Sequence, residues 1–532
     1  MIGGLTGLAL ALSSSVARAD AVTDWNEVAV VATKGFNGIT GSGVALDSNL
    51  ASRIEAIAAK AVFDAINAVD HFSARSYFYS GNVVGSAAAA AAAAAHDVLM
   101  AQLPDPSTDP NIDQRWAQTR SWLDARLLSD VYALGLSFED GGFAAGRSAA
   151  AAALAARKLD GAKPVTSYGA DLGPSTNPGI GIWRQSNASA PAINQMTGAP
   201  SGFDASGAVI QPRASIDLNW RDVMPLSLSL RDKVRLVAQV PFSPAVGSPE
   251  YLKEIEFVRR LGQDTAPPSA RSDDQTAQAL FYKQDAEIFV FEAARIAAQA
   301  RGLSLDQNAA LFALLTATVA DARIAAFDSK YQQRFWRPIT ALNANPDGSV
   351  TNNHQAWRPL AATPSHPSNT AGHSTTGAAG FEILRAFFGD TIRPDRLAVT
   401  LTTLPWLVGT NSGTGRVTTR SVTTFSQAQL ENGASRLYLG VHYGYDNLQG
   451  QLLGLAVAEA IVLGTNDPAA SGIKLRRSRA SLSEIERTLL ARPDLYGLFG
   501  LDTRSGAQKK CDDDRDASRE GRNRGADDER DR

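Results

Sequence analysis

The sequence predicts an all-α fold: one large helical domain built from two helix bundles, with an irregular Gly/Pro-rich excursion between them. Apolar residues recur at three- and four-residue steps in several long segments, which is the pattern of one buried helix face. Two further segments are rich in alanine, the residue with the highest helix propensity. No convincing run of alternating apolar and polar residues indicates strands, and 532 residues are enough to bury such a core.

The N-terminal helical half is expected over residues 20–160. From Asp47 to Asp70 the apolar positions follow one helical face. The unbroken alanine run from Ala87 to Ala95 and the alanine-rich stretch from Ser148 to Leu159 are also expected to be helical. Because alanine lets helices approach closely, both are interpreted as packed helices and not as low-complexity disorder.

The helical periodicity fails over residues 161–248, where Gly, Pro, Ser and Asn multiply, and this part is expected to be an irregular connecting segment. Helical patterning returns over residues 249–466, the C-terminal helical half. Its expected helices are Pro249 to Leu261, Asp274 to Gln299, Leu305 to Ser329 with Asp306 as a cap, His373 to Phe388, and Ser426 to Leu463 with interruptions near Gly444 and Gly450.

Both ends of the chain are expected to lie outside this fold. Residues 1–19 combine an apolar stretch, Leu5 to Leu12, with Ala17-Arg18-Ala19, which is typical of a cleavable signal peptide, although no Lys or Arg precedes the apolar stretch. We therefore expect an exported protein, periplasmic or secreted. Residues 467–504 form a C-terminal extension, and residues 505–532 are expected to be a disordered charged tail because they almost lack apolar side chains.

Composition excludes several classes of function. The net charge is −3, the pI is near 6.1, and no long Lys/Arg block is present, so no nucleic-acid partner is expected. The single cysteine, Cys511, lies in the charged tail, which excludes an internal disulfide framework and a cysteine-ligated metal. No later stretch of about 18 uninterrupted apolar residues occurs, so no stable membrane insertion is expected.

Three dispersed segments carry chemistry, and the first is KYQQRFWRP. Lys330 and Arg337 are seven residues apart, so on a helix both cations can face the same way. Pro338 disfavours α conformation at Arg337, and we expect it to end the helix there and aim the guanidinium into a cleft. The alternative is a solvated basic face.

The second segment is PSHPSNTAGHS. Two prolines stiffen an extended lead-in, and Gly372 lets the chain turn so that free N–H groups point inward at the start of a helix opened by His373. Helix N-termini favour anions through these donors and the helix dipole. His373 could exchange a proton with a bound oxygen, since its unperturbed pKa lies near neutrality. The alternative is a turn with a hydrogen-bonded histidine.

The third segment is SRLYLGVHYGYD, which holds Arg436, His442 and Asp446. The spacing of four places His442 and Asp446 on one helical face, where the carboxylate can receive one imidazole N–H and raise the basicity of the other nitrogen. Such a nitrogen can be a nucleophile or a metal ligand, although a capped helix with a surface ion pair would give the same spacing. Together the three segments can hold a phosphate or vanadate oxyanion from many directions.

In this order, the motifs K-x6-RP, Pro-rich turn ending in Gly-His, and SR-x5-H-x3-D resemble those of the vanadium-dependent haloperoxidases and the related type 2 phosphatidic-acid phosphatases. The flanking segments WRDVMPLSL, DARIAAFDSKYQQRFWRPITALN and RSVTTFSQAQLENGASRLYLGVHYGYD extend the resemblance to the haloperoxidase branch, over residues 20–463. The resemblance implies a vanadate cofactor and the reactants hydrogen peroxide and halide. It leaves the organic acceptor unknown and a homo-oligomer open.

The resemblance also implies roles for individual residues. His442 would bond the vanadium, His373 would be the acid–base residue, and Lys330 would polarise peroxide, which makes these three the candidate catalytic residues. The implied cofactor-binding set is Lys330, Arg337, Gly372, His373, Arg436 and His442. Phosphate could occupy the same site.

The chain departs from the family pattern at Ala371, where the family usually has serine. A missing hydroxyl donor costs about 1–3 kcal/mol of anion binding if nothing replaces it, and Thr370 and Ser374 are nearby but not at the matching position. His366 and Phe327 are the halide-site candidates. The family places histidine at the former position in bromide-oxidising members, so bromide or iodide is expected in preference to chloride.

Three functions remain open at this point. The first is a vanadate-dependent haloperoxidase. The second is a soluble acid phosphatase with His442 as nucleophile and His373 protonating the leaving oxygen. The third is an oxyanion-binding protein whose activity is weakened by Ala371.

Overall fold

The computed structural model describes part of the chain, and it includes every predicted site residue. The described residues are 20–34, 45–162, 180–183, 192–193, 200–201, 217–264, 270–344, 357–395, 398–402, 419–464 and 467–470. The proposed signal peptide, the charged tail and most of the C-terminal extension lie outside them.

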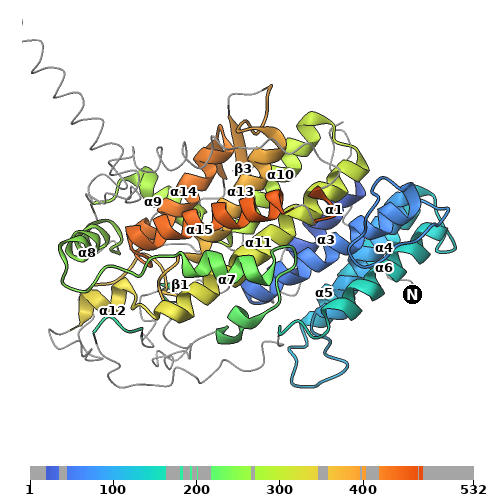
Figure 1. Cartoon of the computed structure of the whole chain (residues 1–532). Coiled ribbons are helices and arrows are strands. Elements are labelled where there is room, and N and C mark those ends of the chain that lie inside the picture. The colour runs from blue at the N-terminus through green and yellow to red at the C-terminus, as the bar shows by residue number, and fades with distance from the viewer. Residues whose placement is uncertain are drawn as a thin grey trace, which may run out of the picture.

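The N-terminal helices form one end of the molecule, drawn in blue and cyan in Figure 1. They are α1 (Ala21–Thr33), α3 (Ser48–Asp70), α4 (Ala87–Gln102), α5 (Trp116–Leu134) and α6 (Gly141–Arg157). The alanine run of α4 is buried between α3 and α6. A Cβ built on Gly146 of α6 would lie 2.6 Å from Ala93 Cβ, so this approach requires small side chains on both helices. The two alanine-rich segments are therefore packed helices, as predicted.

The C-terminal helices form the other end. They are α8 (Pro249–Leu261), α9 (Asp273–Phe281), α10 (Ala286–Arg301), α11 (Leu305–Gln333), α12 (Pro338–Asn343), α13 (Gly372–Phe388), α14 (Phe425–Tyr438) and α15 (Gly444–Leu463). The closest approach is between α13 and α15, where a Cβ on Gly454 would lie 2.1 Å from the Thr375 carbonyl oxygen. Glycine at this position brings α15 against the helix whose N-terminus holds the Gly-His motif.

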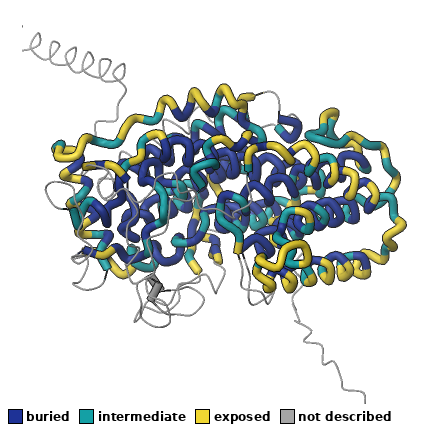
Figure 2. Tube along the Cα trace, turned by 90° about the horizontal axis from the view of Figure 1, so that it is seen from below, coloured by how far each residue is buried: buried dark blue, intermediate teal, exposed yellow. Residues whose placement is uncertain are grey.

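Helix α11 runs through the middle of the molecule and packs against both ends, with α3 on one side and α13 on the other (Figure 1). It is the one helix among the described residues that is long and apolar enough to span a membrane, but its whole apolar window is buried within the fold. Figure 2 shows the buried positions gathered along these central helices, with exposed residues on the periphery. The predicted all-α architecture is confirmed.

Some regular structure occurs that the sequence patterns did not predict. The connecting segment contains helical elements, η2 (Leu218–Asp222) and α7 (Leu230–Ala238), and α7 has its own Ser229 cap. Short antiparallel strands also occur: β1 (Ala192–Ile193) with β2 (Pro200–Ser201), and β3 (Val399–Thr402) with β4 (Thr419–Val422). These pairs are too short to produce a clear alternation in sequence.

Several helix boundaries also differ from the predicted ones. The segment from Asp274 to Gln299 is two helices, broken at residues 282–285. Helix α11 is capped by Ser304, with Gln307 completing the capping box, and not by Asp306. In the last helical segment, the predicted interruption near Gly444 is confirmed by a break at residues 439–443, whereas Gly450 lies inside α15, where it allows close packing on α13.

Candidate functional site

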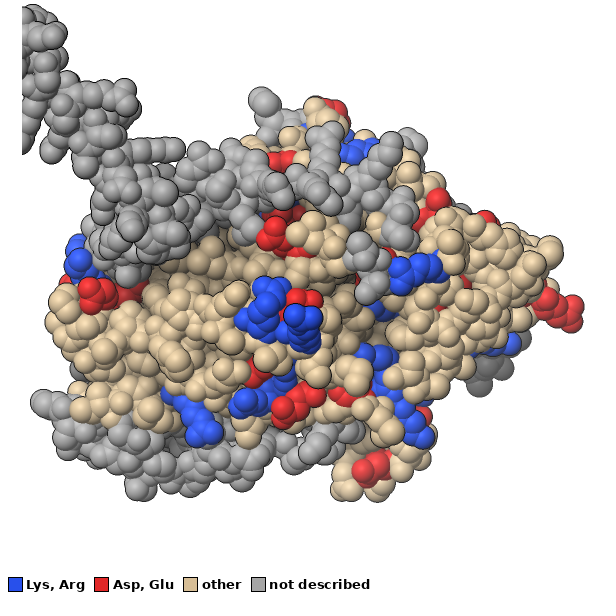
Figure 3. All heavy atoms as spheres, viewed as in Figure 1, with Lys and Arg blue, Asp and Glu red and all other residues tan. Residues whose placement is uncertain are grey.

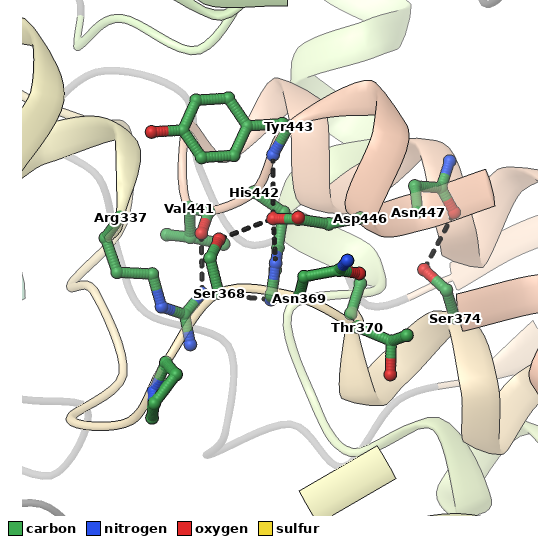
Figure 4. Close-up of polar contacts among 12 residues, drawn as sticks. Arg337, Ser368, Asn369, Thr370, Ser374, Val441, His442, Tyr443, Asp446 and Asn447 are labelled. Carbon is green, nitrogen blue, oxygen red and sulfur yellow. Dashed lines mark hydrogen bonds and ion pairs between the residues drawn. The ribbon is translucent and has the colours of Figure 1, made fainter. Parts of the chain in front are cut away.

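The three predicted segments meet at one buried site between the C-terminal helices (Figure 4). Lys330 lies near the end of α11, Arg337 precedes α12, the Pro-rich turn leads into α13, and the corner between α14 and α15 carries His442. The site is not part of the surface charge pattern. In Figure 3, Lys and Arg are scattered among Asp and Glu, with a compact basic group over α7, whereas Lys330, Arg337 and Arg436 are buried.

The ring of His442 is held between an arginine and a carboxylate. Arg337 Nη1 lies 2.9 Å from His442 Nε2, and His442 Nδ1 lies 3.0 Å from Asp446 Oδ2. A guanidinium can only donate, so Nε2 must accept and the ring proton must sit on Nδ1, from where it is donated to Asp446. This fixes the tautomer that presents a basic Nε2 to the site.

The His442–Asp446 contact is made at a helix start and not along a helix face as predicted. His442 precedes α15, and Asp446 lies in its first turn, where Oδ2 also accepts from the Tyr443 N–H and the Ser368 hydroxyl (Figure 4). Burial raises the pKa of Asp446 to about 6, while the Ser368 hydrogen bond and the Lys330 charge oppose this rise. The carboxylate therefore joins the Pro-rich turn to the α14–α15 corner.

Arg337 is positioned differently from the prediction. Helix α11 has already ended at Gln333, and Pro338 begins α12, because proline is tolerated in a first turn where no N–H is needed. The guanidinium also donates to the carbonyl oxygens of His366 (2.9 Å) and Val441 (2.6 Å). Arg337 is thus a buried residue that joins two backbone segments of the site. The alternative that it belongs to a solvated basic helix face is excluded.

Lys330 is fully buried, and its ammonium group donates to the carbonyl oxygens of Pro367 (3.1 Å), Ser368 (3.0 Å) and Thr370. An ammonium has three N–H groups, so all of them are engaged in bracing the turn before α13. Burial and the nearby Arg337 lower the pKa of Lys330 well below its ordinary value. To contact peroxide as predicted, Lys330 would therefore have to share one N–H between a backbone carbonyl oxygen and the peroxide.

Arg436 differs from the other cations because two of its guanidinium nitrogens make no hydrogen bond within the described residues. The residue is 4% exposed, and its Nε and Nη1 have no hydrogen-bond partner in the described part of the chain. Burial, followed by the nearby charge of Arg337, lowers its pKa to about 9. Because a buried charge without a partner is strongly unfavourable, this guanidinium indicates a site for an anion.

The N-terminus of α13 offers further donors. Among the described residues, none accepts a hydrogen bond from the N–H groups of Gly372, His373 or Ser374. Ala371 occupies the N-cap position and has no side-chain oxygen to cap the helix. These free donors and the helix dipole favour an anion here.

Neither Ser374 nor Thr370 has a free hydroxyl to replace the serine that is expected in place of Ala371. The Ser374 hydroxyl donates to Asn447 Oδ1 at 2.7 Å, and Thr370 Oγ1 lies 3.4 Å from Thr375 Oγ1. Both hydroxyls therefore have partners of their own. The donor that we expect to be missing at Ala371 is therefore not supplied by either of these hydroxyls.

One ring nitrogen of His373 makes no hydrogen bond to the described part of the protein. Its Nε2 is buried and without a hydrogen bond in the described structure, and its ring interacts with the backbone of Gln284. Burial and the charge of Arg436 lower its pKa well below 6.5, so the imidazole is neutral at pH 7 and not poised near neutrality as predicted. Burial and nearby cations likewise lower the pKa values of His366 and His442.

The two halide-site candidates are brought together. The ring centroids of Phe327 and His366 are 5.1 Å apart, and His366 Nδ1 lies 2.9 Å from Arg337 Nη2. This places a hydrophobic face and an imidazole next to the arginine that contacts His442.

Sequence reasoning missed several residues around the site. Lys283 has its pKa lowered to about 8 by burial and by Arg436, and Asp285 is held by Lys34 (2.7 Å) and Arg323 (3.4 Å). Both lie in the break between α9 and α10. A break at this point could have been suspected from the charged KQD sequence inside a long apolar helical pattern.

Comparison with known proteins connects this geometry to a family. Residues 310–468 match the model of the second helical-bundle domain of vanadium chloroperoxidase, and this range contains the cation and histidine set described above. The vanadium chloroperoxidase of Curvularia inaequalis is 29% identical over 171 residues. The chain is similar to the vanadium haloperoxidases.

That sequence match covers 26% of this chain and only 28% of the length of the Curvularia relative. Structural similarity extends further. A bacterial vanadium-dependent iodoperoxidase superimposes with a TM-score of 0.58 at 18% identity, covering 83% of this chain and 95% of the other. A bacterial vanadium-dependent chloroperoxidase in its holo form gives a TM-score of 0.57 at 16% identity, covering 80% and 93%. These similarities show a shared fold.

Proposed function

We propose that this protein is an enzyme that uses vanadate to oxidise a halide with hydrogen peroxide, with bromide or iodide preferred to chloride. The observation that carries the proposal is the unpartnered guanidinium of Arg436, buried in the same site as the free N-terminus of α13 and His442. The similarity to a vanadium chloroperoxidase and to a bacterial vanadium-dependent iodoperoxidase supports the reaction class.

The residues present suit vanadate. His442 would hold it through Nε2, the nitrogen whose lone pair is left free for bonding once the proton lies on Nδ1. Arg436 and the α13 N–H groups would balance the negative charge of vanadate. The Arg337 N–H that now donates to His442 Nε2 would donate to a vanadate oxygen instead. When bound, vanadate supplies a Lewis acid that activates peroxide without changing its own oxidation state. Among the described residues, no group of three or more His, Cys, Asp or Glu gathers to hold a metal cation instead.

His373 would hold or deliver a proton at Nε2. Its neutral ring, with a nitrogen directed at no protein partner, can accept a proton from peroxide once an anion offsets the charge of Arg436. Lys330 would polarise the oxygen that the halide attacks, by sharing one N–H that now bonds a carbonyl. The pair of His366 and Phe327 would set the halide preference, since it forms an imidazole-lined wall next to Arg337.

The direct test is a bromination assay on protein reconstituted with orthovanadate, run beside p-nitrophenyl phosphate hydrolysis without vanadate. We expect vanadate-dependent bromination and iodination that exceed chlorination. Phosphate ester cleavage without halogenation would instead establish the acid phosphatase, since the same His442 Nε2 could take a phosphoryl group. Vanadate binding with neither activity would establish an oxyanion-binding protein.

Two variants separate the roles of the histidines. His442→Ala is expected to abolish vanadate binding because it removes the nitrogen that would bond vanadium, whereas His373→Ala should retain part of the binding and lose turnover. Titration with orthovanadate and the bromination rate measure the two effects separately. An equal loss of vanadate binding in both variants would contradict this assignment.

A further inference from the structure

A buried carboxyl group on α8 contacts the corner that carries His442. Glu254 is 1% exposed, and its Oε2 accepts the Gly444 N–H at 2.6 Å. Gly444 is the first residue of α15 and lies two residues after His442. Within the described residues, Glu254 Oε1 is buried and has no hydrogen-bond partner. The sequence patterns did not single out this residue.

We propose that Glu254 is a positioning residue for the oxyanion site: by holding the N-terminus of α15, its carboxyl group fixes the direction in which His442 presents Nε2. The inference rests on the proposed function only in taking this site to bind an oxyanion. It does not depend on which reaction follows.

Helix α8 contacts the corner at two successive residues. Besides the bond from Glu254 to Gly444, the ring of Tyr251 packs against that of Tyr443 at 6.2 Å. The backbone immediately after His442 is therefore fixed from outside its own helix. Because the His442 ring is only one residue away, a shift of this backbone changes where its Nε2 points.

The corner is also joined to the anion-binding end of α13. The Ala371 N–H donates to the Asp446 carbonyl oxygen at 2.9 Å, and Asp446 Oδ2 accepts from both the His442 ring and the Tyr443 N–H. A displaced α15 N-terminus would thus move the carboxylate that orients His442 and the residue that opens α13. Partners of this kind around a ligating histidine typically change affinity by about 10–100-fold when removed.

The protonation state of Glu254 suits this role. Burial raises its pKa to about 8, with the nearby Asp446 adding to the rise and the Gly444 N–H opposing it. At neutral pH the side chain is therefore the uncharged acid, whose carbonyl oxygen can still accept an N–H. It holds α15 without placing a second negative charge beside Asp446.

The experiment compares Glu254→Gln, Glu254→Asp and Glu254→Leu in the full chain. Glutamine keeps an uncharged acceptor at the same reach, aspartate withdraws the acceptor by one methylene, and leucine removes it. The dissociation constant of inorganic phosphate is measured by calorimetry, the free energy of unfolding by urea denaturation, and the His442 ring by its Nδ1–H resonance. We expect E254Q to stay within about twofold of the wild-type affinity, and E254D and E254L to weaken it by about tenfold or more.

Asp64→Leu is the matched control. Asp64 is also a buried carboxyl group that accepts backbone N–H groups, from Tyr77 (2.8 Å), Phe78 (2.7 Å) and Tyr79 (2.9 Å), but it lies in the N-terminal half. Its removal should reduce stability without changing phosphate affinity or the His442 resonance. This separates a loss of positioning from a general loss of stability.

The inference is overturned if E254D binds phosphate as tightly as E254Q and leaves the His442 resonance unmoved. If E254L does not fold, E254D still tests the positioning role, because this variant keeps a carboxyl group and changes only its reach. If the wild-type protein binds neither phosphate nor orthovanadate, the proposed function fails. The His442 resonance still tests the role of Glu254 in that case, since a shift in E254D but not in E254Q would support it.

Discussion

Replacing Arg436 with methionine is expected to weaken oxyanion binding and to stabilise the protein in anion-free buffer at the same time. The two effects have one cause. The guanidinium is buried, and its Nε and Nη1 have no partner within the described residues, so folding removes its charge from water, and only the attraction of Asp285 offsets part of the cost. An oxyanion supplies the missing partner, and methionine needs none.

The magnitude follows from the pKa of Arg436, which is lowered from 12.5 to about 9, chiefly by burial. This difference of about 3.5 units disfavours the charged form in the folded state by about 5 kcal/mol. The penalty is fully present at pH 7, below the folded-state value, and the loss of side-chain packing in the variant offsets part of the gain. Two charged hydrogen bonds of about 1.5–3 kcal/mol each are lost, so affinity should fall by roughly 10²–10⁴-fold.

Urea denaturation in phosphate-free buffer and calorimetric titration with orthovanadate measure the two effects. Arg385→Met is the control, because Arg385 is equally buried but bonds Glu382 (2.6 Å) and Gln429 (2.7 Å). Breaking this pair should destabilise the protein by about 3–5 kcal/mol and leave vanadate affinity unchanged.

The reasoning is refuted if R436M is destabilised as R385M is and still binds orthovanadate like the wild type. That result would mean that Arg436 is an ordinary structural cation with a partner in the folded protein. A fall in affinity without a gain in stability would mean that Arg436 binds the anion but that burying its charge costs little.

Three further predictions concern the same site. Ala371→Ser should tighten orthovanadate binding by about 1–3 kcal/mol in a titration, and an unchanged affinity would contradict the expected missing donor at this position. The pKa of His366 is lowered in the folded state, so the unfolded state binds more protons below pH 6.5 and the free energy of unfolding falls as pH falls. His366→Phe should therefore reduce the pH dependence of the free energy of unfolding by about 1.4 kcal/mol per pH unit between pH 6.5 and 5. Urea denaturation measures this slope, and an unchanged slope would contradict the prediction. Saturating phosphate should raise the pKa of His373, measured by NMR, because the anion offsets Arg436; a constant value would place the anion elsewhere.

Local patterns were sufficient for the helical fold and for the identity of the three segments. The alanine run of α4 and the periodic face of α3 express intrinsic propensity and burial, which are properties of neighbouring residues. The Gly372 turn could likewise be read locally, since a helix start leaves its first N–H groups free wherever it lies. Helix ends were less reliable, as at Arg337, because Pro338 is compatible with either ending or starting a helix.

The sequence by itself therefore determined which side chains could hold an oxyanion, because their residue types and order are explicit in the chain. Only the tertiary structure decided how each one is used. Lys330 bonds carbonyl groups, Arg436 has no partner in the described structure, and Glu254 holds the corner beside His442. These differences depend on desolvation and on hydrogen-bond partners supplied by distant segments, and neither is encoded in local periodicity.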